Sequence, residues 1–363
     1  MSIRNDRGTV LNPLESHGVL KKGLLQVYTG DAEETNFAPM GLSLRAAGHN
    51  LRTHMTCFLR QEWMDGAHTA SGLLKPNLVI EHVKTETIPP DGKFNREVIN
   101  EMSQYFKMAR EALIGGKFDI VVLNEINRIC SQGIISYDDV LELIREKPDN
   151  VELVLTGPGA NNDIIERADL VTEMVCHPAK ERPYKDNDQH IIAPNEIVTG
   201  NGKGKTTHCL GKAMIMSCMG TRSTILQYIK SPRAYGEVKA IKRLPLLEIK
   251  TMGEGFLETH ASVPSKRHLE TAKRAWEACL REVFSLKYGL IVMDEINVAT
   301  YYRLLRPERV REMLFLKPEK LHLILSGRNA HPEVLEGASV VIEMREIKHP
   351  FKKGIKARRG IEF

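Results

Sequence analysis

An internal duplication with constant spacing runs through this chain of 363 residues. Three short motifs of the first copy return 170 positions later. VYTG at 27 returns as IVTG, VVLNEIN at 121 returns as IVMDEIN, and LTG at 155 returns as LSG. The same spacing carries CFLR at 57 onto QYIK at 227. A repeat of this length is far longer than the unit of a solenoid. The chain is therefore expected to hold two whole domains of one fold, residues 1–180 and 196–363, joined by a polar, proline-containing linker at 181–195.

Each copy alternates short runs rich in β-branched residues with longer segments of helical periodicity. Apolar residues recur at three- and four-residue steps from Leu269 to Leu286, and from Val98 to Leu113 in the first copy, so a helix is predicted in each. Strands that alternate with helices form a parallel sheet covered on both faces. In the second copy we expect strands at 197–199, 224–228, 290–293 and 321–325.

A loop rich in glycine and lysine follows the first of these strands, GNGKGKTT at 200–207, and leads into a helical pattern. Glycines let successive N–H groups converge on an anion, and the helix N-terminus adds partial positive charge. Lys205 is expected to reach the outer phosphates and Thr206 to ligate Mg²⁺, although Thr199 stands where the general P-loop pattern has its first glycine. The residues predicted to bind nucleotide are Gly200, Asn201, Gly202, Lys203, Gly204, Lys205, Thr206 and Thr207.

Two acids, Asp294 and Glu295, end another strand about 90 residues further along. A carboxylate at the end of a neighbouring parallel strand is where P-loop proteins hold Mg²⁺, so we group both acids with Thr206 as the metal site. Arg328 follows the strand 321–325 and is a further candidate for the phosphates. The predicted fold is α/β, with two tandem P-loop NTPase (RecA-like) domains, each a mainly parallel sheet flanked by helices.

The first copy carries different charges at the same positions. Glu33 stands for Lys203, Thr35 for Lys205 and Asn124 for Asp294. Each reversal of charge beside a polyphosphate, at close range in a partly desolvated loop, costs several kcal/mol. We therefore expect that the first copy does not bind a nucleoside triphosphate and acts as a structural or regulatory partner.

Composition excludes several classes of protein. With 51 basic and 46 acidic residues the net charge is +5, which is mild for a protein that binds nucleic acid. There is no apolar run of about 18 residues, and the first residues lack the apolar core of a secretion signal. The six cysteines form no C-x-x-C pair. These features predict a cytoplasmic protein without a membrane or nucleic-acid partner.

The second copy resembles the ATP:corrinoid adenosyltransferases of the bacterial P-loop class, which serve cobalamin biosynthesis. The likeness is carried by the loop at 199–207, MDE at 293–295, SGR at 326–328, and the C-terminal segments KHPF and GIEF. The first copy resembles the same family more weakly, through LSLRAAGH at 42–49. The C-terminal tail is expected to be a strand that is solvated or faces the corrinoid side chains.

The resemblance implies that a cobalt(I) corrinoid attacks the 5′ carbon of ATP and expels tripolyphosphate. It implies catalytic roles for Lys205, Glu295 and Phe256, the last within a Gly-Phe-x-Trp segment that displaces the lower ligand of the corrinoid. Here that segment reads GFLET, so the tryptophan is absent, and Trp276 is expected in the core. The resemblance also implies ATP and a corrinoid as substrates, Mg²⁺, and an electron donor such as reduced flavin or a flavoprotein. Because the family commonly forms homodimers, the two halves are expected to form an internal pseudo-dimer.

Two alternatives remain open from the sequence. One is a P-loop ATPase that releases orthophosphate. The other is a non-catalytic protein that binds ATP and a corrinoid, which the missing tryptophan and the altered first loop favour. The product formed from ATP distinguishes these two alternatives from the adenosyltransferase: tripolyphosphate for the transferase, orthophosphate for the ATPase and none for the binding protein.

Overall fold

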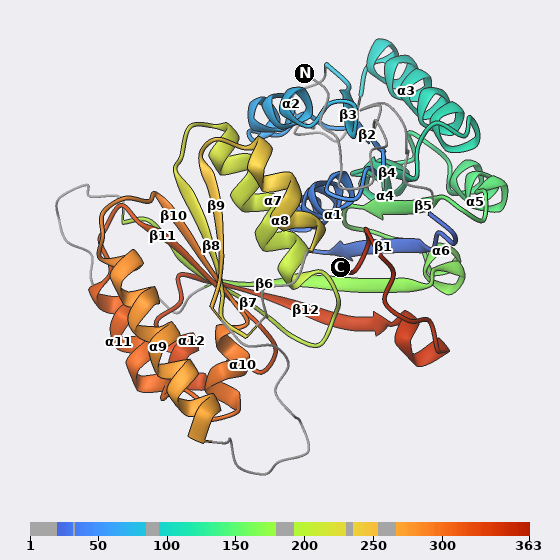
Figure 1. The fold of residues 1–363 in the computed structure, drawn as a ribbon. Helices are drawn as coiled ribbons and strands as arrows, with labels where there is room; N and C mark the ends of the chain where they lie inside the picture. The colour runs from blue at the N-terminus through green and yellow to red at the C-terminus, as the bar shows by residue number, and fades with distance from the viewer. Residues whose placement is uncertain (1–19, 32, 85–93, 179–191, 230–234, 253–265) are drawn as a thin grey trace, which may run out of the picture.

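The protein is described here from a computed structural model that covers residues 20–31, 33–84, 94–178, 192–229, 235–252 and 266–363. Its strands form one sheet that both copies share, in the order β3-β2-β4-β5-β1-β6-β12-β7-β11-β10-β8-β9 (Figure 1). When each strand is matched to its repeat, this order reads the same from either end. The two halves are therefore related by an approximate twofold axis, and the predicted α/β fold with two tandem halves is confirmed.

The elements of the two copies follow each other in the same sequence. Those of the first copy are β1 (Leu25–Gly30), η1 (Glu33–Asn36), α1 (Phe37–Ala47), β2 (Thr53–Cys57), α2 (Met64–Leu73), β3 (Leu78–His82), α3 (Arg96–Ile114), β4 (Ile120–Asn124), α4 (Ile126–Ser131), α5 (Tyr137–Glu146), β5 (Glu152–Thr156), α6 (Asn162–Arg167) and β6 (Leu170–Pro178). Those of the second are β7 (Asn195–Thr199), α7 (Lys205–Cys218), β8 (Ser223–Gln227), α8 (Gly236–Ala240), η2 (Ile241–Arg243), β9 (Leu247–Thr251), α9 (Lys266–Val283), β10 (Leu290–Asp294), α10 (Ile296–Tyr301), α11 (Pro307–Leu316), β11 (His322–Ser326), α12 (Pro332–Glu336), β12 (Val340–Lys348) and η3 (Pro350–Lys353).

All four strands predicted in the second copy are present, as β7, β8, β10 and β11, with ends shifted by at most two residues. The two predicted helices are α3 and α9. Asn95 begins α3, because its side chain accepts a hydrogen bond from the backbone N–H of Val98 at 2.9 Å. The predicted linker lies largely outside the described residues. No helix within the described ranges is long and apolar enough to cross a membrane.

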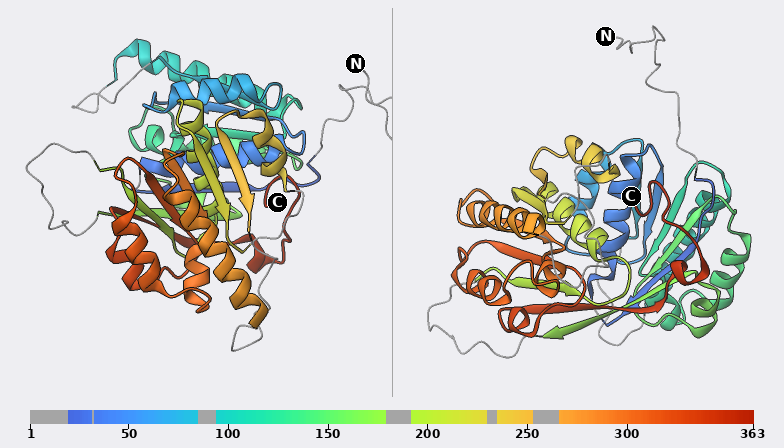
Figure 2. Two further views of the ribbon diagram at one scale, coloured as in Figure 1. Left: turned by 60° about the vertical axis from the view of Figure 1, so that its left-hand side comes forward. Right: turned by 60° about the horizontal axis from the view of Figure 1, so that its bottom comes forward.

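The halves meet at the only antiparallel pair among the described strands, β6 and β12. Met174 and Met344 are equivalent in the duplication and also face each other in the register of this pair. The twofold axis therefore passes between them. Figure 2 shows the continuous sheet with the blue helix α1 and the yellow-green helix α7 together at its middle, while the orange helices of the second half and the green helices of the first lie toward opposite ends.

Helices α1 and α7 cross on one face of the sheet at another equivalent pair, Gly41 and Gly211. A Cβ atom at Gly41 would lie 1.7 Å from the carbonyl oxygen of Thr207, and one at Gly211 would lie 2.0 Å from that of Phe37. Only glycine permits backbones to approach this closely. All residues of α1 are buried, as expected for a helix enclosed on every side.

Three apolar cores result from this arrangement. The central core contains residues of both halves, mainly from α1, α2 and α7 and the inner face of the sheet. Each half also has an outer core beneath its other helices. Trp276 lies in the outer core of the second half, as predicted for a core residue. The shared central core makes the two halves one folding unit rather than two domains in loose contact.

The C-terminal tail of the second half crosses to the first half and ends beside α1 (Figure 1). The predicted strand is not present, because residues 349–363 form η3 and turns. Ile361 is buried in the central core, and Arg358 forms an ion pair with Glu152 of β5 at 2.6 Å. Arg358 of the tail thus has a charged partner in the first half, whereas Phe351 remains exposed to solvent.

The glycine crossing generates a prediction for stability. Gly41→Ala is expected to lower the free energy of unfolding by about 3 kcal/mol, since the added methyl group would collide with a backbone carbonyl that a side-chain rotation cannot move. Chemical denaturation measures the change. Gly72→Ala is the matched control, because a Cβ there meets nothing within 4 Å and alanine favours the helix. Equal effects of the two substitutions would contradict the close crossing.

Candidate functional site

The loop between β7 and α7 is held against the central strand β12. The N–H of Gly202 donates to the carbonyl oxygen of Met344 at 2.7 Å. Gly200 has a φ of +92°, and a Cβ there would lie 2.3 Å from the same oxygen. Gly204, with a φ of +115°, begins α7. Glycine is thus required here both by the left-handed backbone and by the neighbouring strand.

Lys205 lies across the inside of this loop. Its Nζ donates to the carbonyl oxygens of Gly200 and Gly202, each at 2.7 Å, and the residue is only 9% exposed. Burial first, and then the nearby charge of Arg328, lower the pKa of Lys205 to about 8, although Glu295 and Asp294 act in the opposite direction. A buried ammonium group held by carbonyl oxygens is well suited to exchange them for phosphate oxygens.

The predicted metal residues meet at the carboxyl ends of neighbouring strands. The hydroxyl of Thr206 donates to Oδ1 of Asp294 at 3.0 Å, and Ser326 at the end of β11 donates to the same atom at 2.7 Å. Asp294 is 1% exposed. Hydroxyl and carboxylate oxygens are the donors that Mg²⁺ prefers, so this set fits the predicted ion.

The other predicted residues surround this centre. Glu295 begins α10 with a φ of +67°, and its N–H donates to the hydroxyl of Ser326 at 3.3 Å. Arg328 is exposed at the end of β11, within electrostatic range of Lys205. The Thr207 hydroxyl donates to the carbonyl of Gly204 at 2.9 Å, and Asn201 is exposed. Phe256 lies outside the described residues.

Lys203 takes a different direction from Lys205. Its Nζ lies 2.6 Å from Oε1 of Glu362 in the C-terminal tail. Burial lowers the pKa of Lys203, while Glu362 opposes that shift. The two lysines that the sequence places together in one loop therefore have different partners: carbonyl oxygens of the loop for Lys205, and the tail for Lys203.

The equivalent place in the first half is filled by its own side chains. The amide of Asn36, which replaces Thr206, donates to Oε1 of Glu125 at 2.8 Å. The hydroxyl of Thr156 lies within hydrogen-bond distance of the amide oxygens of Asn36 and Asn124, at 2.9 and 2.8 Å. Glu125 also forms an ion pair with Arg128 at 2.7 Å. These residues are buried apart from the half-buried Arg128, so the first half has a closed network with one paired acid where the second half gathers Thr206, Asp294 and Ser326.

The two sites nevertheless share their backbone. Glu125 and Glu295 both have a φ of +67°, an uncommon conformation for a residue other than glycine. The halves thus differ in the chemistry of their side chains on one common frame. This contrast agrees with the expectation from the sequence that only the second loop accommodates phosphates.

Four residues near the loop were not predicted as site residues. Ser326 could have been recognised, because its equivalent Thr156 also ends a strand. Tyr28, Thr172 and Glu362 contact the loop from the first half or the tail, and no local signal in the sequence marks them.

Comparison with known proteins gives a consistent result. The family model for ATP:corrinoid adenosyltransferase BtuR/CobO/CobP matches the chain twice, over residues 21–187 and 195–363. The corrinoid adenosyltransferases of Pseudomonas aeruginosa and Sinorhizobium sp. are 34% and 35% identical to it, over 46% and 49% of this chain and 82% and 83% of their own. The uncharacterized protein all2391 of Nostoc sp. is 30% identical over 94% of this chain and 95% of its own, so it shares the double length.

A pair of substitutions tests the difference between the loops. Lys205→Ala is expected to weaken the binding of Mg-ATP by about 100-fold or more, because a charge-assisted contact to phosphate is lost. Thr35→Ala, at the equivalent position, should leave binding unchanged. Isothermal titration calorimetry measures both affinities. Equal losses in the two variants would contradict the asymmetry.

The pKa of Lys205 generates a second prediction. Because only the ammonium form attracts phosphate, affinity for Mg-ATP should be constant between pH 7 and 7.5. It should then fall by up to about ten-fold per pH unit above pH 8, until the pKa of the bound state is reached. Binding measured from pH 7 to 9.5 tests this, and a flat profile would show that Lys205 does not carry the interaction.

Proposed function

The chain belongs to the ATP:corrinoid adenosyltransferase family, in a tandem-duplicated form, and we propose that its second half transfers the 5′-deoxyadenosyl group of ATP to a cobalt(I) corrinoid and releases tripolyphosphate. One observation carries the assignment to the second half. Lys205, Thr206 and Asp294 meet at its phosphate loop, whereas the first half closes the equivalent position with neutral amides and a paired glutamate.

The loop is suited to the departure of a polyphosphate. The electron pair of cobalt(I) forms the bond to C5′, the C5′–O bond breaks, and its electrons leave on the tripolyphosphate. Charge therefore grows on the oxygen next to C5′ within an already anionic group. Lys205 and the N-terminus of α7 provide fixed positive charge for this group in a partly buried loop, where electrostatic stabilisation is strong.

Thr206 and Asp294 would hold Mg²⁺, and Glu295 lies next to them at the start of α10. When bound, the ion would neutralise phosphate charge as a Lewis acid. Cobalt(I) is itself a strong nucleophile, so the reaction needs no protein base. We accordingly assign Glu295 to the surroundings of the metal and Arg328 to the outer phosphates.

The corrinoid must reach its cobalt(I) state before transfer, and we propose that reduced flavin or a flavoprotein supplies the electron. Phe256 is the candidate residue for displacing the lower ligand of the corrinoid. The sequence GFLET lacks the tryptophan of the family segment, so this chain would perform that displacement with one aromatic residue of the usual pair.

We further propose that the two halves act as an internal pseudo-dimer. The antiparallel pairing of β6 with β12 and the crossing of Gly41 with Gly211 support this, since both place equivalent residues against each other across the axis. Two copies of one fold that share a central core in this way have the geometry of a symmetric homodimer within one chain.

Anaerobic incubation with Mg-ATP and a chemically reduced corrinoid tests the proposal. We expect the light-sensitive spectrum of an alkyl–cobalt bond and one equivalent of tripolyphosphate per corrinoid. Lys205→Ala should abolish both products, because the leaving group loses its buried cation, whereas Thr35→Ala should retain them.

The alternatives give different outcomes in the same assay. Orthophosphate formed without an alkyl–cobalt product would identify an ATPase. ATP bound without turnover would identify a non-catalytic binding protein. Either result would overturn the proposed transfer.

A further inference from the structure

The first half touches the phosphate loop of the second half at two points. The hydroxyl of Thr172 on β6 donates to the carbonyl oxygen of Lys203 at 2.9 Å. The ring of Tyr28 on β1 lies against Gly204, where a Cβ would be 2.8 Å from Cε1 of the ring. Both Thr172 and Tyr28 are buried, so these contacts belong to the interior of the protein.

The contact from Thr172 orients one peptide group of the loop. A trans peptide is planar, so the carbonyl of Lys203 and the N–H of Gly204 point in opposite directions. With the carbonyl held toward Thr172, the N–H of Gly204 is directed away from the first half. This N–H belongs to the residue that begins α7, where free backbone donors attract phosphate.

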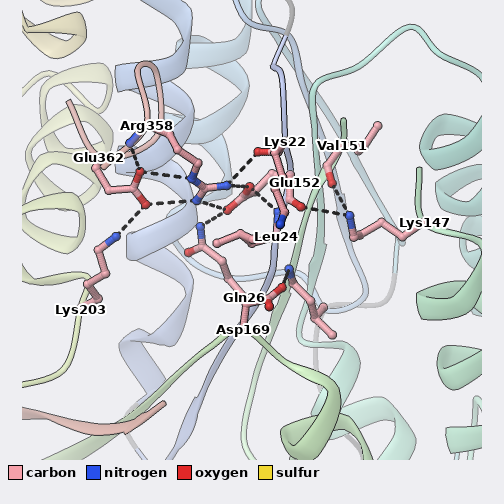
Figure 3. Close-up of polar contacts among 12 residues, drawn as sticks. Lys22, Leu24, Gln26, Lys147, Val151, Glu152, Asp169, Lys203, Arg358 and Glu362 are labelled. Carbon is pink, nitrogen blue, oxygen red and sulfur yellow. Dashed lines mark hydrogen bonds and ion pairs between the residues drawn. The ribbon is translucent and has the colours of Figure 1, made fainter. Parts of the chain in front are cut away.

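A chain of charged side chains reaches the loop from the same side (Figure 3). Lys203 pairs with Glu362 at 2.6 Å, and Arg358 donates to Glu362 at 3.1 Å. Arg358 also binds both carboxylate oxygens of Glu152, at 2.6 and 2.9 Å. Glu152 is fully buried in the first half and accepts a further bond from the N–H of Leu24 at 2.8 Å.

This chain is a fixed structure rather than a loose surface contact. The side chains of Arg358 and Glu362 are only 13% and 12% exposed. Although burial alone would raise it, the charges of Lys203 and Arg358 hold the pKa of Glu362 below its usual value. Paired charges that are largely withdrawn from water, with each carboxylate bound twice or more, have defined positions.

Within the part of the chain that the structure describes, these contacts run in one direction only. If the twofold relation held for side chains, the second half would support the first loop in the same way. The equivalent positions instead carry residues that make different contacts or none of this kind: Ile342 for Thr172, Val198 for Tyr28, His322 for Glu152 and Ile192 for Glu362. Ile342 has no hydroxyl to donate, and His322 lies 3.3 Å from Glu196 of its own half.

We propose that the first half positions the phosphate loop of the second half, with Thr172 as the positioning residue for the Lys203–Gly204 peptide and Glu152, through Arg358 and Glu362, as the anchor for Lys203. This inference rests on the proposed binding of ATP by the second half. It gives the first half a specific role, because the half that has lost the charges needed to bind a nucleotide holds in shape the loop that its twin uses.

Hydrogen exchange of the amides at 200–206 in the nucleotide-free protein tests the proposal without relying on catalysis. Thr172→Val removes the hydroxyl while keeping the shape of the side chain, and should speed exchange in this loop by about five-fold, the value of one neutral hydrogen bond. Affinity for Mg-ATP should fall by a similar factor. Thr172→Ser, which keeps the hydroxyl, should restore both.

Thr53→Val is the matched control, because Thr53 is equally buried in the first half but lies on β2, away from the loop. It should leave exchange at 200–206 and affinity for ATP unchanged. Identical loop exchange in Thr172→Val and Thr53→Val would overturn the proposal. If the unmodified protein bound no ATP, the proposed function would fail. The exchange rates of the amides at 200–206 would still test whether Thr172 positions the loop.

Glu362→Gln tests the charged anchor independently, because it removes the charge of the side chain and keeps its size. Exchange at 200–206 should again increase, because Lys203 loses its ion pair. Glu336→Gln, which removes an exposed partner of Arg311, serves as its control. Equal exchange in these two variants would show that the tail does not hold the loop.

Discussion

Contact between the backbones of α1 and α7 sets the distance between the halves of this protein. Gly41 and Gly211 lie at the crossing, where a single methyl group would meet a carbonyl oxygen at 2.0 Å or less. With the helices this close, β6 and β12 pair and the inner faces of both halves enclose one apolar core. The phosphate loop of the second half is then brought against β1 and β6 of the first.

Duplication gave each half the same backbone arrangement, and the two halves differ in the charges of their site side chains. The shared left-handed backbone at Glu125 and Glu295 shows that the strand ends keep one geometry. At the loop, a buried cation in the second half corresponds to Thr35 in the first, and Asp294 corresponds to Asn124. A polyphosphate responds to charge far more than to small differences in shape, and a few substitutions give the two sites different charges without changing the fold.

The ion pairs of the tail join the two halves at the loop. Arg358 is held between Glu152 in the first half and Glu362, which pairs with Lys203 in the loop of the second. Under the proposed assignment of nucleotide binding to the second half, an acid of the first half would thus anchor the loop that its twin uses.

Much of this protein was determined by its sequence alone: the duplication, the alternation of strands and helices, and the loop from Gly200 to Thr207 with Asp294 after a neighbouring strand. Those features are local, because propensity, periodicity and glycine-rich turns act over a few residues, and a constant spacing of 170 transfers each from one copy to the other. Only the tertiary structure decided that the tail folds over the first half, that Lys203 pairs with Glu362, and that Thr172 supports the loop. These contacts join residues 31 to 206 positions apart, and they depend on how the two halves of one sheet meet across an axis. No pattern along the chain records that geometry.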